Sequence, residues 1–203
     1  MKREEKNALS RQKILDNARK EFADRGYGLS SVNTICSEGE ISKGILYHYF
    51  KDKDEIYLTC IQQCFDGLTA YLRQSRKKME GKIEECLDSY FSSRFQYFSE
   101  NPEDQKLFCE AIISPPNQLK EKIAEIKAEY DNLNIEVLDD ILSLVKLRPD
   151  VTRLEVIDTF RQYQDFINAR YQMTGAAQID GKERERSCEK ALLVLLYGVI
   201  SRE

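Results

Sequence analysis

The stretch Ser42-Lys43-Gly44-Ile45-Leu46-Tyr47-His48-Tyr49-Phe50 decides how the N-terminal part of the chain is interpreted. Ser42 is typical of an N-cap, because its hydroxyl can accept a hydrogen bond from a free backbone N–H of the first helical turn. Leu46 and Phe50 lie four residues apart and therefore share one face of a helix. Gly44 lowers helix stability by about 1 kcal/mol relative to Ala, but it permits close approach of another molecule. The stretch predicts a short helix with one buried and one exposed face.

Two further helices are predicted upstream of this stretch. The first runs from about Ser10, as its N-cap, to about Arg25, and Gly26 ends it. The second follows Ser31, whose hydroxyl suits an N-cap, and ends at Gly39. The apolar positions of the first helix recur at helical spacing: Ile14, Leu15, Ala18 and Phe22. Three short helices within about 40 residues have the size of a helix-turn-helix unit.

The exposed side chains of the 42–50 stretch suit contact with DNA. Lys43 has the length and charge to reach a guanine edge or a phosphate, and Ile45 can contact a thymine methyl. Tyr47 and His48 carry donors for phosphate oxygens, and Lys53 adds a further charge. The alternative interpretation is a short amphipathic helix whose aromatic residues only pack.

The same residues resemble the recognition helix of the TetR/AcrR family of transcriptional repressors. The similarity continues at matching spacings over about residues 10–57, through Arg11, Ile14-Leu15, Ala18, Phe22, Gly26-Tyr27, Ser31-Val32, Ile35 and Lys53-Asp54-Glu55-Ile56. It implies an all-α dimer with a DNA-binding domain at 1–52 and an effector-binding and dimerisation domain at 53–203. The DNA-contacting residues that it implies, together with the chemistry above, are Ser31, Ser42, Lys43, Gly44, Ile45, Tyr47, His48, Tyr49 and Lys53.

The turn before the recognition helix departs from the family pattern. The family usually has Ala-Gly-Val where this chain has Gly39-Glu40-Ile41. Either Gly39 takes over the turn in a shifted register, or Glu40 adopts a left-handed backbone at a cost of about 1 kcal/mol. In both cases the carboxylate of Glu40 would lie near phosphates.

Composition and periodicity predict that the rest of the chain is also helical. Of 203 residues, 41% are hydrophobic and 33% are charged, while Gly and Pro together number only 13. Helical patterns follow one another along the chain at about 52–78, 82–100, 102–114, 118–147, 150–174 and 181–201. With the three N-terminal helices this makes about nine helices and no convincing strand, so the predicted fold class is all-α.

Charge and hydropathy give weaker information on location and partners. Residues 1–53 hold 11 Lys or Arg and 8 Asp or Glu, a balance of +3, whereas 54–203 hold 20 and 27, a balance of −7. A basic partner surface, if the protein has one, is therefore expected in the N-terminal part, and a balance of +3 by itself does not indicate nucleic-acid binding. The longest apolar run, 191–200, is about half as long as a membrane span, so we expect a cytoplasmic protein without a membrane partner.

Six cysteines are scattered through the helical pattern. Cys60 and Cys64 lie four residues apart on one helix face, which admits a metal or redox role as well as simple burial in the core. Because His48 is the only histidine and belongs to the DNA-reading stretch, neither a metal site nor a cofactor is expected.

Aromatic residues of the later helices are candidates for an effector cavity, and the C-terminal apolar run is a candidate for a dimer interface. A helix that is apolar all round must be covered on every side, and a partner helix would cover what the chain itself does not. Arg94 and Arg170 would favour an anionic ligand if both faced inward. The candidate ligand-binding residues are Phe91, Phe95, Phe108, Tyr163, Phe166 and Arg170. The candidate dimer residues are Phe160, Ile167, Leu193, Leu196 and Tyr197.

These features together predict a ligand-responsive repressor that binds a palindromic operator as a dimer and is released by a small effector. A DNA-binding protein without an effector is the alternative, and an enclosed cavity in the C-terminal domain would discriminate between them. A small helical enzyme is disfavoured, because the sequence has no Gly-rich phosphate loop and no metal-ligand spacing.

Overall fold

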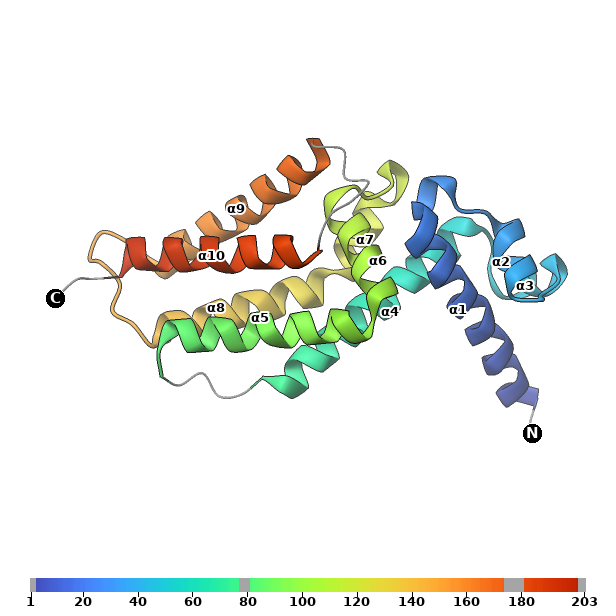
Figure 1. The fold of residues 1–203 in the computed structure, drawn as a ribbon, viewed down its shortest axis with the longest axis horizontal. Helices are drawn as coiled ribbons and strands as arrows, with labels where there is room; N and C mark the ends of the chain where they lie inside the picture. Colours follow the sequence, from blue (N-terminus) through green and yellow to red (C-terminus); the bar gives the residue numbers. More distant parts are fainter. Residues whose placement is uncertain (1–2, 77–80, 174–180, 201–203) are drawn as a thin grey trace. The chain divides into compact units, whose positions relative to one another are not determined.

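The computed structural model of the protein describes residues 3–76, 81–173 and 181–200 (Figure 1). Within these ranges the chain forms ten α-helices and one 3-10 helix, η1, and its only β-type pairing is an isolated bridge between Leu147 and Ile200. The predicted all-α class is confirmed. The helices are α1 (Arg3–Leu29), α2 (Val32–Glu38), α3 (Lys43–Tyr49), α4 (Lys53–Ser75), α5 (Ile83–Glu100), α6 (Pro102–Ile113), η1 (Asn117–Leu119), α7 (Lys120–Ile126), α8 (Ala128–Ser143), α9 (Arg153–Met173) and α10 (Gly181–Val199).

The chain divides into two compact units, and the expected boundary between a DNA-binding domain at 1–52 and an effector-binding domain at 53–203 stays a prediction. The first unit combines residues 1–66 with 101–127, and the second combines 67–100 with 128–203. The helix α4 therefore begins in the first unit and ends in the second. Segment 101–127, which the sequence assigned to the C-terminal domain, belongs with the N-terminal helices.

In the first unit, α1 packs against α2, α3 and α6. The predicted apolar face of α1 is buried: Phe22 is 1% exposed, and Ile14, Leu15 and Ala18 are fully buried. The predicted start of this helix is wrong, because α1 begins at Arg3 and Ser10 lies inside it. No Gly or Pro interrupts residues 3–9, and the hydroxyl of Tyr49 donates a hydrogen bond to Asn7 Oδ1 at 3.2 Å, which attaches this extension to α3.

The prediction of nine helices is also corrected. The segment expected as one helix over 118–147 forms η1, α7 and α8, with an interruption at Lys127, where φ is −80° and ψ is −4°. Lysine is a good helix former, so residue type gave no warning of this break. The interruption coincides with the boundary between the two units.

In the second unit, α10 packs along α5 and α9, and α9 packs on α8. Leucine, isoleucine and phenylalanine side chains from all four helices form its core, including Leu87, Ile141, Phe160 and Leu196. No described helix is long and apolar enough to cross a membrane.

Candidate functional site

The helix pair α2–α3 begins with two serine caps, as predicted. The Oγ of Ser31 accepts a hydrogen bond from the N–H of Asn33 at 3.1 Å, and the Oγ of Ser42 accepts one from the N–H of Ile45 at 3.2 Å. Both caps satisfy a backbone donor that the helix itself leaves without a partner. They determine where each short helix starts.

The turn between α2 and α3 adopts the second of the two predicted arrangements. Glu40 has a left-handed backbone with φ of 47°, whereas Gly39 has φ of −83°. Gly39 is needed for a different reason: a Cβ there would lie 2.8 Å from Ile41 Cδ1 and 3.0 Å from the carbonyl oxygen of Ile35. The turn therefore uses glycine for close packing and accepts backbone strain at the exposed Glu40.

The outward face of α3 consists of exposed predicted DNA-contact residues. Leu46 and Phe50 are buried at 0% and 1% exposure, so the opposite face of the helix is turned to solvent. A Cβ at Gly44 would meet no atom nearer than Ser42 Oγ at 3.9 Å. The exposed residues of this face are Ser42, Lys43, Gly44, Ile45, Tyr47 and His48. We call these six residues the α3 face.

Two other predicted DNA-contact residues are half-buried. The backbone N–H of Ser31 donates to Glu21 Oε1 at 2.9 Å, and Glu21 is itself buried. The hydroxyl of Tyr49 is directed to Asn7, and its ring lies edge-on to His48 with centroids 5.0 Å apart. Ser31 and Tyr49 therefore both make contacts within the protein. Their contacts with DNA stay a prediction.

Lys53 has a structural role that the sequence did not predict. Its ammonium donates hydrogen bonds to the carbonyl oxygens of Tyr27 at 2.7 Å and Ser30 at 3.2 Å, and it lies 4.2 Å from the centroid of the Tyr27 ring. These contacts tie the start of α4 to the end of α1. A phosphate contact by Lys53 stays a prediction.

A polar cluster around Glu110 lies beneath this junction and was missed by sequence reasoning. The Glu110 carboxylate accepts hydrogen bonds from the backbone N–H of Tyr27 at 2.8 Å and from the hydroxyl of Tyr57 at 2.9 Å. The Tyr27 hydroxyl donates to Asp54 and accepts from Gln118. Burial, with help from Asp54, raises the pKa of Tyr27 to about 12, and burial raises the pKa of Glu110. One feature of the sequence could have revealed this cluster: Glu110 is the single acidic residue inside the apolar run 107–113.

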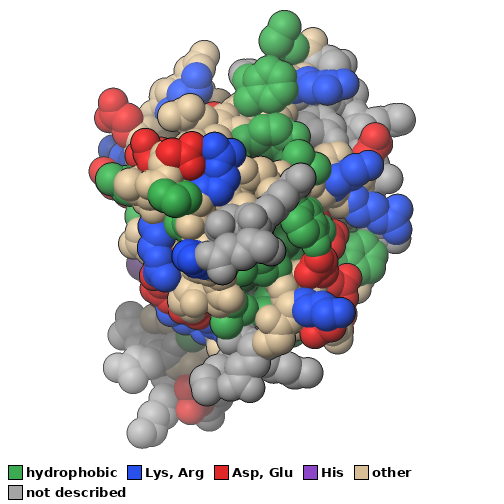
Figure 2. Space-filling model, turned by 90° about the vertical axis from the view of Figure 1, so that its left-hand side faces the viewer, with side chains coloured by type: hydrophobic (Ala, Val, Ile, Leu, Met, Phe, Trp, Pro, Cys, Tyr) green, Lys and Arg blue, Asp and Glu red, His purple; other side chains and the backbone are tan. Residues whose placement is uncertain are grey.

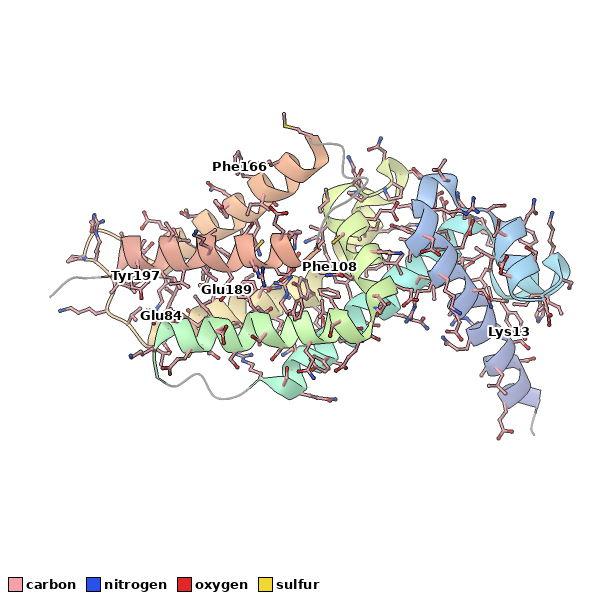
Figure 3. All side chains as sticks on the ribbon, in the orientation of Figure 1. Lys13, Glu84, Phe108, Phe166, Glu189 and Tyr197 are labelled. Carbon is pink, nitrogen blue, oxygen red and sulfur yellow. The ribbon has the colours of Figure 1, made fainter. Side chains whose placement is uncertain are left out.

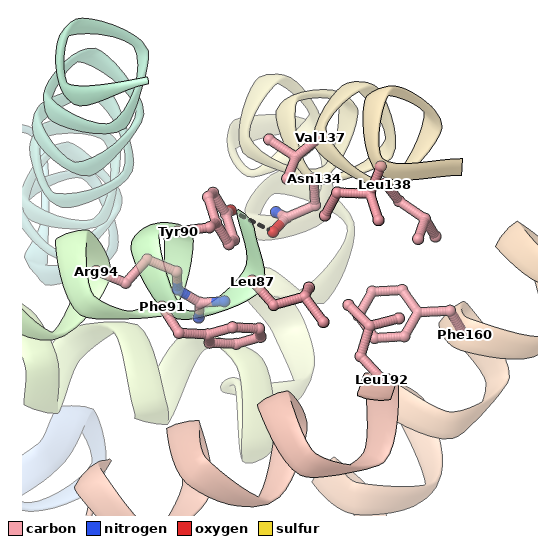
Figure 4. A pocket seen from close by; sticks show the side chains of 10 residues that line it. Leu87, Tyr90, Phe91, Arg94, Asn134, Val137, Leu138, Phe160 and Leu192 are labelled. Atoms are coloured by element: carbon pink, nitrogen blue, oxygen red, sulfur yellow. Dashed lines mark hydrogen bonds between the residues drawn. The ribbon is translucent and has the colours of Figure 1, made fainter. Parts of the chain in front are cut away.

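A small pocket lies in the second unit among α5, α8, α9 and α10 (Figure 4). The pocket has room for about one water molecule. Seven of its ten lining side chains are apolar, and the polar ones are Tyr90, Arg94 and Asn134. Tyr90 and Asn134 are joined by a hydrogen bond of 2.6 Å.

Of the six predicted ligand-binding residues, the structure brings only Phe91 to this pocket. Phe108 lies in the first unit, where its ring packs on Phe65 with centroids 5.4 Å apart. The other four, Phe95, Tyr163, Phe166 and Arg170, are exposed on their helices. Helical spacing showed that these aromatic residues lie on helices. It did not show which of them face the interior of their unit and which face solvent.

Arg94 is buried at the pocket wall and is paired with an acid from a distant helix. Its guanidinium donates to Glu185 Oε1 at 2.9 Å, and Arg184 approaches the same oxygen at 3.2 Å. The rings of Tyr90, Phe91 and Tyr130 lie within 6 Å of the Arg94 guanidinium carbon. Of the two arginines that the sequence offered to an anionic ligand, Arg94 is buried and Arg170 is exposed, so the condition that both face inward is not met.

The predicted dimer residues separate into two groups. Phe160, Ile167 and Leu196 are at most 7% exposed in the single chain, and their part in a dimer interface stays a prediction. Leu193 is half-buried and Tyr197 is 53% exposed. The large apolar side chains exposed on α9 and α10 include Tyr163, Phe166, Val194 and Tyr197, and Figure 3 labels two of them.

Cys60 and Cys64 are fully buried in the first unit. Burial raises the pKa of Cys60 to about 12 and that of Cys64 well above its ordinary value. Among the described residues, no group of three or more His, Cys, Asp or Glu side chains could hold a metal ion. This environment supports the interpretation of the two thiols as core residues.

Comparison with known protein families gives matches to both parts of the chain. Residues 14–60 match the family described as bacterial regulatory proteins, tetR family, and residues 81–195 match the tetracyclin repressor-like C-terminal domain. Two curated relatives are biofilm operon icaADBC HTH-type negative transcriptional regulators named IcaR. The Staphylococcus aureus protein is 27% identical over 68% of this chain and 78% of its own length. The Staphylococcus epidermidis protein is 24% identical over 65% and 67%, respectively.

Solved structures with the same fold include regulators from several bacteria. The Bacillus subtilis transcriptional regulator FadR in complex with stearoyl-CoA has a TM-score of 0.66 and 19% identity, covering 89% of this chain and 96% of that one. A TetR-family structure from Syntrophomonas wolfei has a TM-score of 0.67 and 16% identity, with coverage of 97% and 100%. Because the two family matches span most of the chain, this protein belongs to the TetR family of DNA-binding transcriptional regulators.

Proposed function

We propose that this regulator is a repressor that binds a palindromic operator as a dimer and is released when a small effector enters its second unit. It acts in the cytoplasm and has no enzymatic activity. The observation that carries the DNA-binding part is the α3 face, where Lys43, Ile45 and Tyr47 surround the unobstructed Gly44. A helix with this outline fits the major groove, where side chains read base edges.

Exposed apolar side chains on α9 and α10 support the dimer. Phe166 is 62% exposed, Val194 66% and Tyr197 53%. The space-filling view in Figure 2 shows hydrophobic side chains at the surface with Lys, Arg, Asp and Glu around them. A two-fold dimer would present two copies of α3, and two-fold symmetry in the protein requires a palindromic site in the DNA.

Two observations support release by an effector. The pocket in the second unit has apolar walls with three polar groups, a composition typical of small-molecule sites. The FadR neighbour binds stearoyl-CoA, so at least one protein of this fold takes up a small ligand. The IcaR relatives are named negative regulators, which supports repression. The alternative is a DNA-binding protein without an effector.

The test starts with footprinting on the DNA that flanks the protein's own gene, followed by affinity measurements on the protected site. Gly44→Leu should abolish operator binding, because the added side chain occupies the space that DNA must enter. Gly28→Leu is the matched control, since a Cβ at Gly28 meets nothing within 4 Å, as one at Gly44 meets only Ser42 Oγ at 3.9 Å, but Gly28 lies in α1. Unchanged operator affinity in a folded Gly44→Leu protein would refute the proposal.

A further inference from the structure

We propose that the effector is a carboxylic acid with a single alkyl chain, whose carboxylate binds Arg94 and whose chain occupies the apolar side of the pocket. This inference deepens the proposed function and rests on it for the role of the pocket. Its starting point is that a permanently charged side chain forms part of a mostly apolar pocket wall.

The position of Arg94 favours an anion. Arg94 is 3% exposed, and it is held by Glu185 on one side and by aromatic rings around the guanidinium. Figure 4 shows the guanidinium beside the Phe91 ring, close to Leu87. Because Arg94 and Arg184 share the single carboxylate of Glu185, the group keeps one net positive charge, which attracts an anion strongly where water screens it little. A cationic ligand would be repelled for the same reason.

The pair between Arg94 and Glu185 indicates which anion fits. The group that this guanidinium already binds inside the core is a carboxylate, at a donor–acceptor distance of 2.9 Å. The planar fork of an arginine offers five N–H donors and matches the geometry of carboxylates. A ligand carboxylate therefore has the size and charge that this site accommodates.

The remaining walls indicate the rest of the ligand. Beyond Arg94, the pocket is bordered by aliphatic and phenyl side chains of four helices, among them Leu87, Val137, Ile141, Phe160 and Leu192. These surfaces offer no charged partner to a polar ligand, whereas an alkyl chain would gain about 0.8 kcal/mol for each methylene group that it buries. Because the space holds about one water, the walls must separate as the chain enters.

Binding at this point would affect the helix that carries the proposed dimer surface. Arg94 is on α5 and Glu185 is on α10, which also carries Val194 and Tyr197. A ligand carboxylate competes with Glu185 for the same guanidinium. Its entry would weaken the bond between α5 and α10 and permit α10 to shift.

The test uses decanoate, with decanol and decyltrimethylammonium as probes of the same chain length, in isothermal titration calorimetry on the full chain without DNA. The native protein should bind decanoate about tenfold or more tightly than decanol and should not bind the cation. Glu185→Gln removes the competing charge but keeps an acceptor, so it should bind decanoate about tenfold more tightly.

The double variant Arg94→Gln/Glu185→Gln replaces the pair by two neutral amides but keeps the Arg184 guanidinium, so its preference for decanoate over decanol should fall rather than vanish. Arg153→Gln is the control, because Arg153 forms an exposed ion pair with Asp139 on the same unit. No decanoate binding to the native chain, equal binding of decanol, or an unchanged preference in the double variant would each overturn the inference.

The outcome for DNA is measured separately. If decanoate binds as expected but leaves an operator complex intact, the ligand assignment stands and release by this effector is refuted. If a neutral or cationic compound releases the DNA while decanoate does not bind, the proposed function stands and the carboxylate inference fails.

Discussion

The side-chain carboxylate of Glu110 accepts a hydrogen bond of 2.8 Å from the backbone N–H of Tyr27, directly after the break of α1 at Gly26. A Cβ at Gly26 would lie 3.0 Å from the same carboxylate, and its φ of 68° is one that glycine adopts at little cost. The helix α6 is therefore attached to the end of α1 at a point where the backbone favours glycine and a Cβ would press on the Glu110 carboxylate.

Replacing Glu110 should destabilise the first unit. In Glu110→Ala the N–H of Tyr27 and the hydroxyl of Tyr57 lose their acceptor, which costs about 1–3 kcal/mol of unfolding free energy for each buried donor left without one. Urea unfolding followed by circular dichroism measures this loss. Glu125→Ala, an exposed position on α7, serves as the control and should change the stability by less than about 0.5 kcal/mol.

The same residue should make stability depend on pH. Because burial raises the pKa of Glu110, the folded chain holds this proton more tightly than the unfolded chain. Its contribution to folding is thus fully present below the unfolded pKa of about 4.3 and is lost as pH rises through the folded pKa. The unfolding free energy of the native chain should fall relative to that of Glu110→Gln as pH rises from 3.5 to 7. A difference that stays constant over this range would contradict the expectation.

The turn before α3 should respond oppositely to substitutions at adjacent positions. Glu40→Gly relieves a left-handed backbone and should raise stability by about 1 kcal/mol. Gly39→Ala introduces a Cβ that meets Ile41 and the carbonyl oxygen of Ile35 at 3.0 Å or less, and should lower stability by about 1–3 kcal/mol. Thermal denaturation of both variants checks the signs. Stabilisation by both substitutions would show that Gly39 is not closely packed.

Lys43 and Lys53 should differ in how their loss affects the protein. Lys43 is exposed on α3, so Lys43→Ala should leave the melting temperature unchanged and cost about 1–3 kcal/mol of operator binding per half-site if it reads a base. Lys53→Ala removes two hydrogen bonds to backbone carbonyls and should lower stability as well as binding to any DNA. Melting curves and affinities at several salt concentrations separate the two effects. A Lys53→Ala protein of native stability would contradict the structural role.

Charges on the outer face of α10 should prevent dimerisation without unfolding the chain. Val194→Asp and Tyr197→Asp place a carboxylate on exposed positions and should yield folded monomer in sedimentation velocity experiments. Leu196→Asp differs, because it buries a charge at a position that is 1% exposed and should unfold the second unit. Leu29→Asp, 80% exposed in the first unit, is the control. Native dimers of both outer-face variants would exclude this surface.

The thiols should react according to burial. Cys60 and Cys64 are fully buried and their raised pKa values leave little reactive thiolate at pH 8, whereas Cys109 is half-buried. Iodoacetamide labelling followed by mass spectrometry should modify Cys109 first and reach the other two only after unfolding. Rapid modification of Cys60 or Cys64 in the folded chain would reopen the redox interpretation.

Local rules were sufficient for much of the helical framework. Ser31 and Ser42 were predicted as caps and act as caps, because each accepts a hydrogen bond from a backbone N–H two or three residues further on. Apolar spacing similarly identified the buried faces of α1 and α3, since a helix repeats every 3.6 residues whatever surrounds it. The exposed α3 face followed from the same periodicity.

Contacts between distant segments were decided only by the tertiary structure. The acceptors for Lys53 lie 23 and 26 residues away, and Glu185 lies 91 residues from Arg94. The sequence of an apolar run does not show which side of the helix packs against the rest of the chain. Leu196 and Val194 could therefore not be distinguished from the sequence, although Leu196 is buried and Val194 is exposed. Periodicity describes a single helix, whereas burial and charge pairing depend on which helices meet, and that is settled by packing across the whole unit.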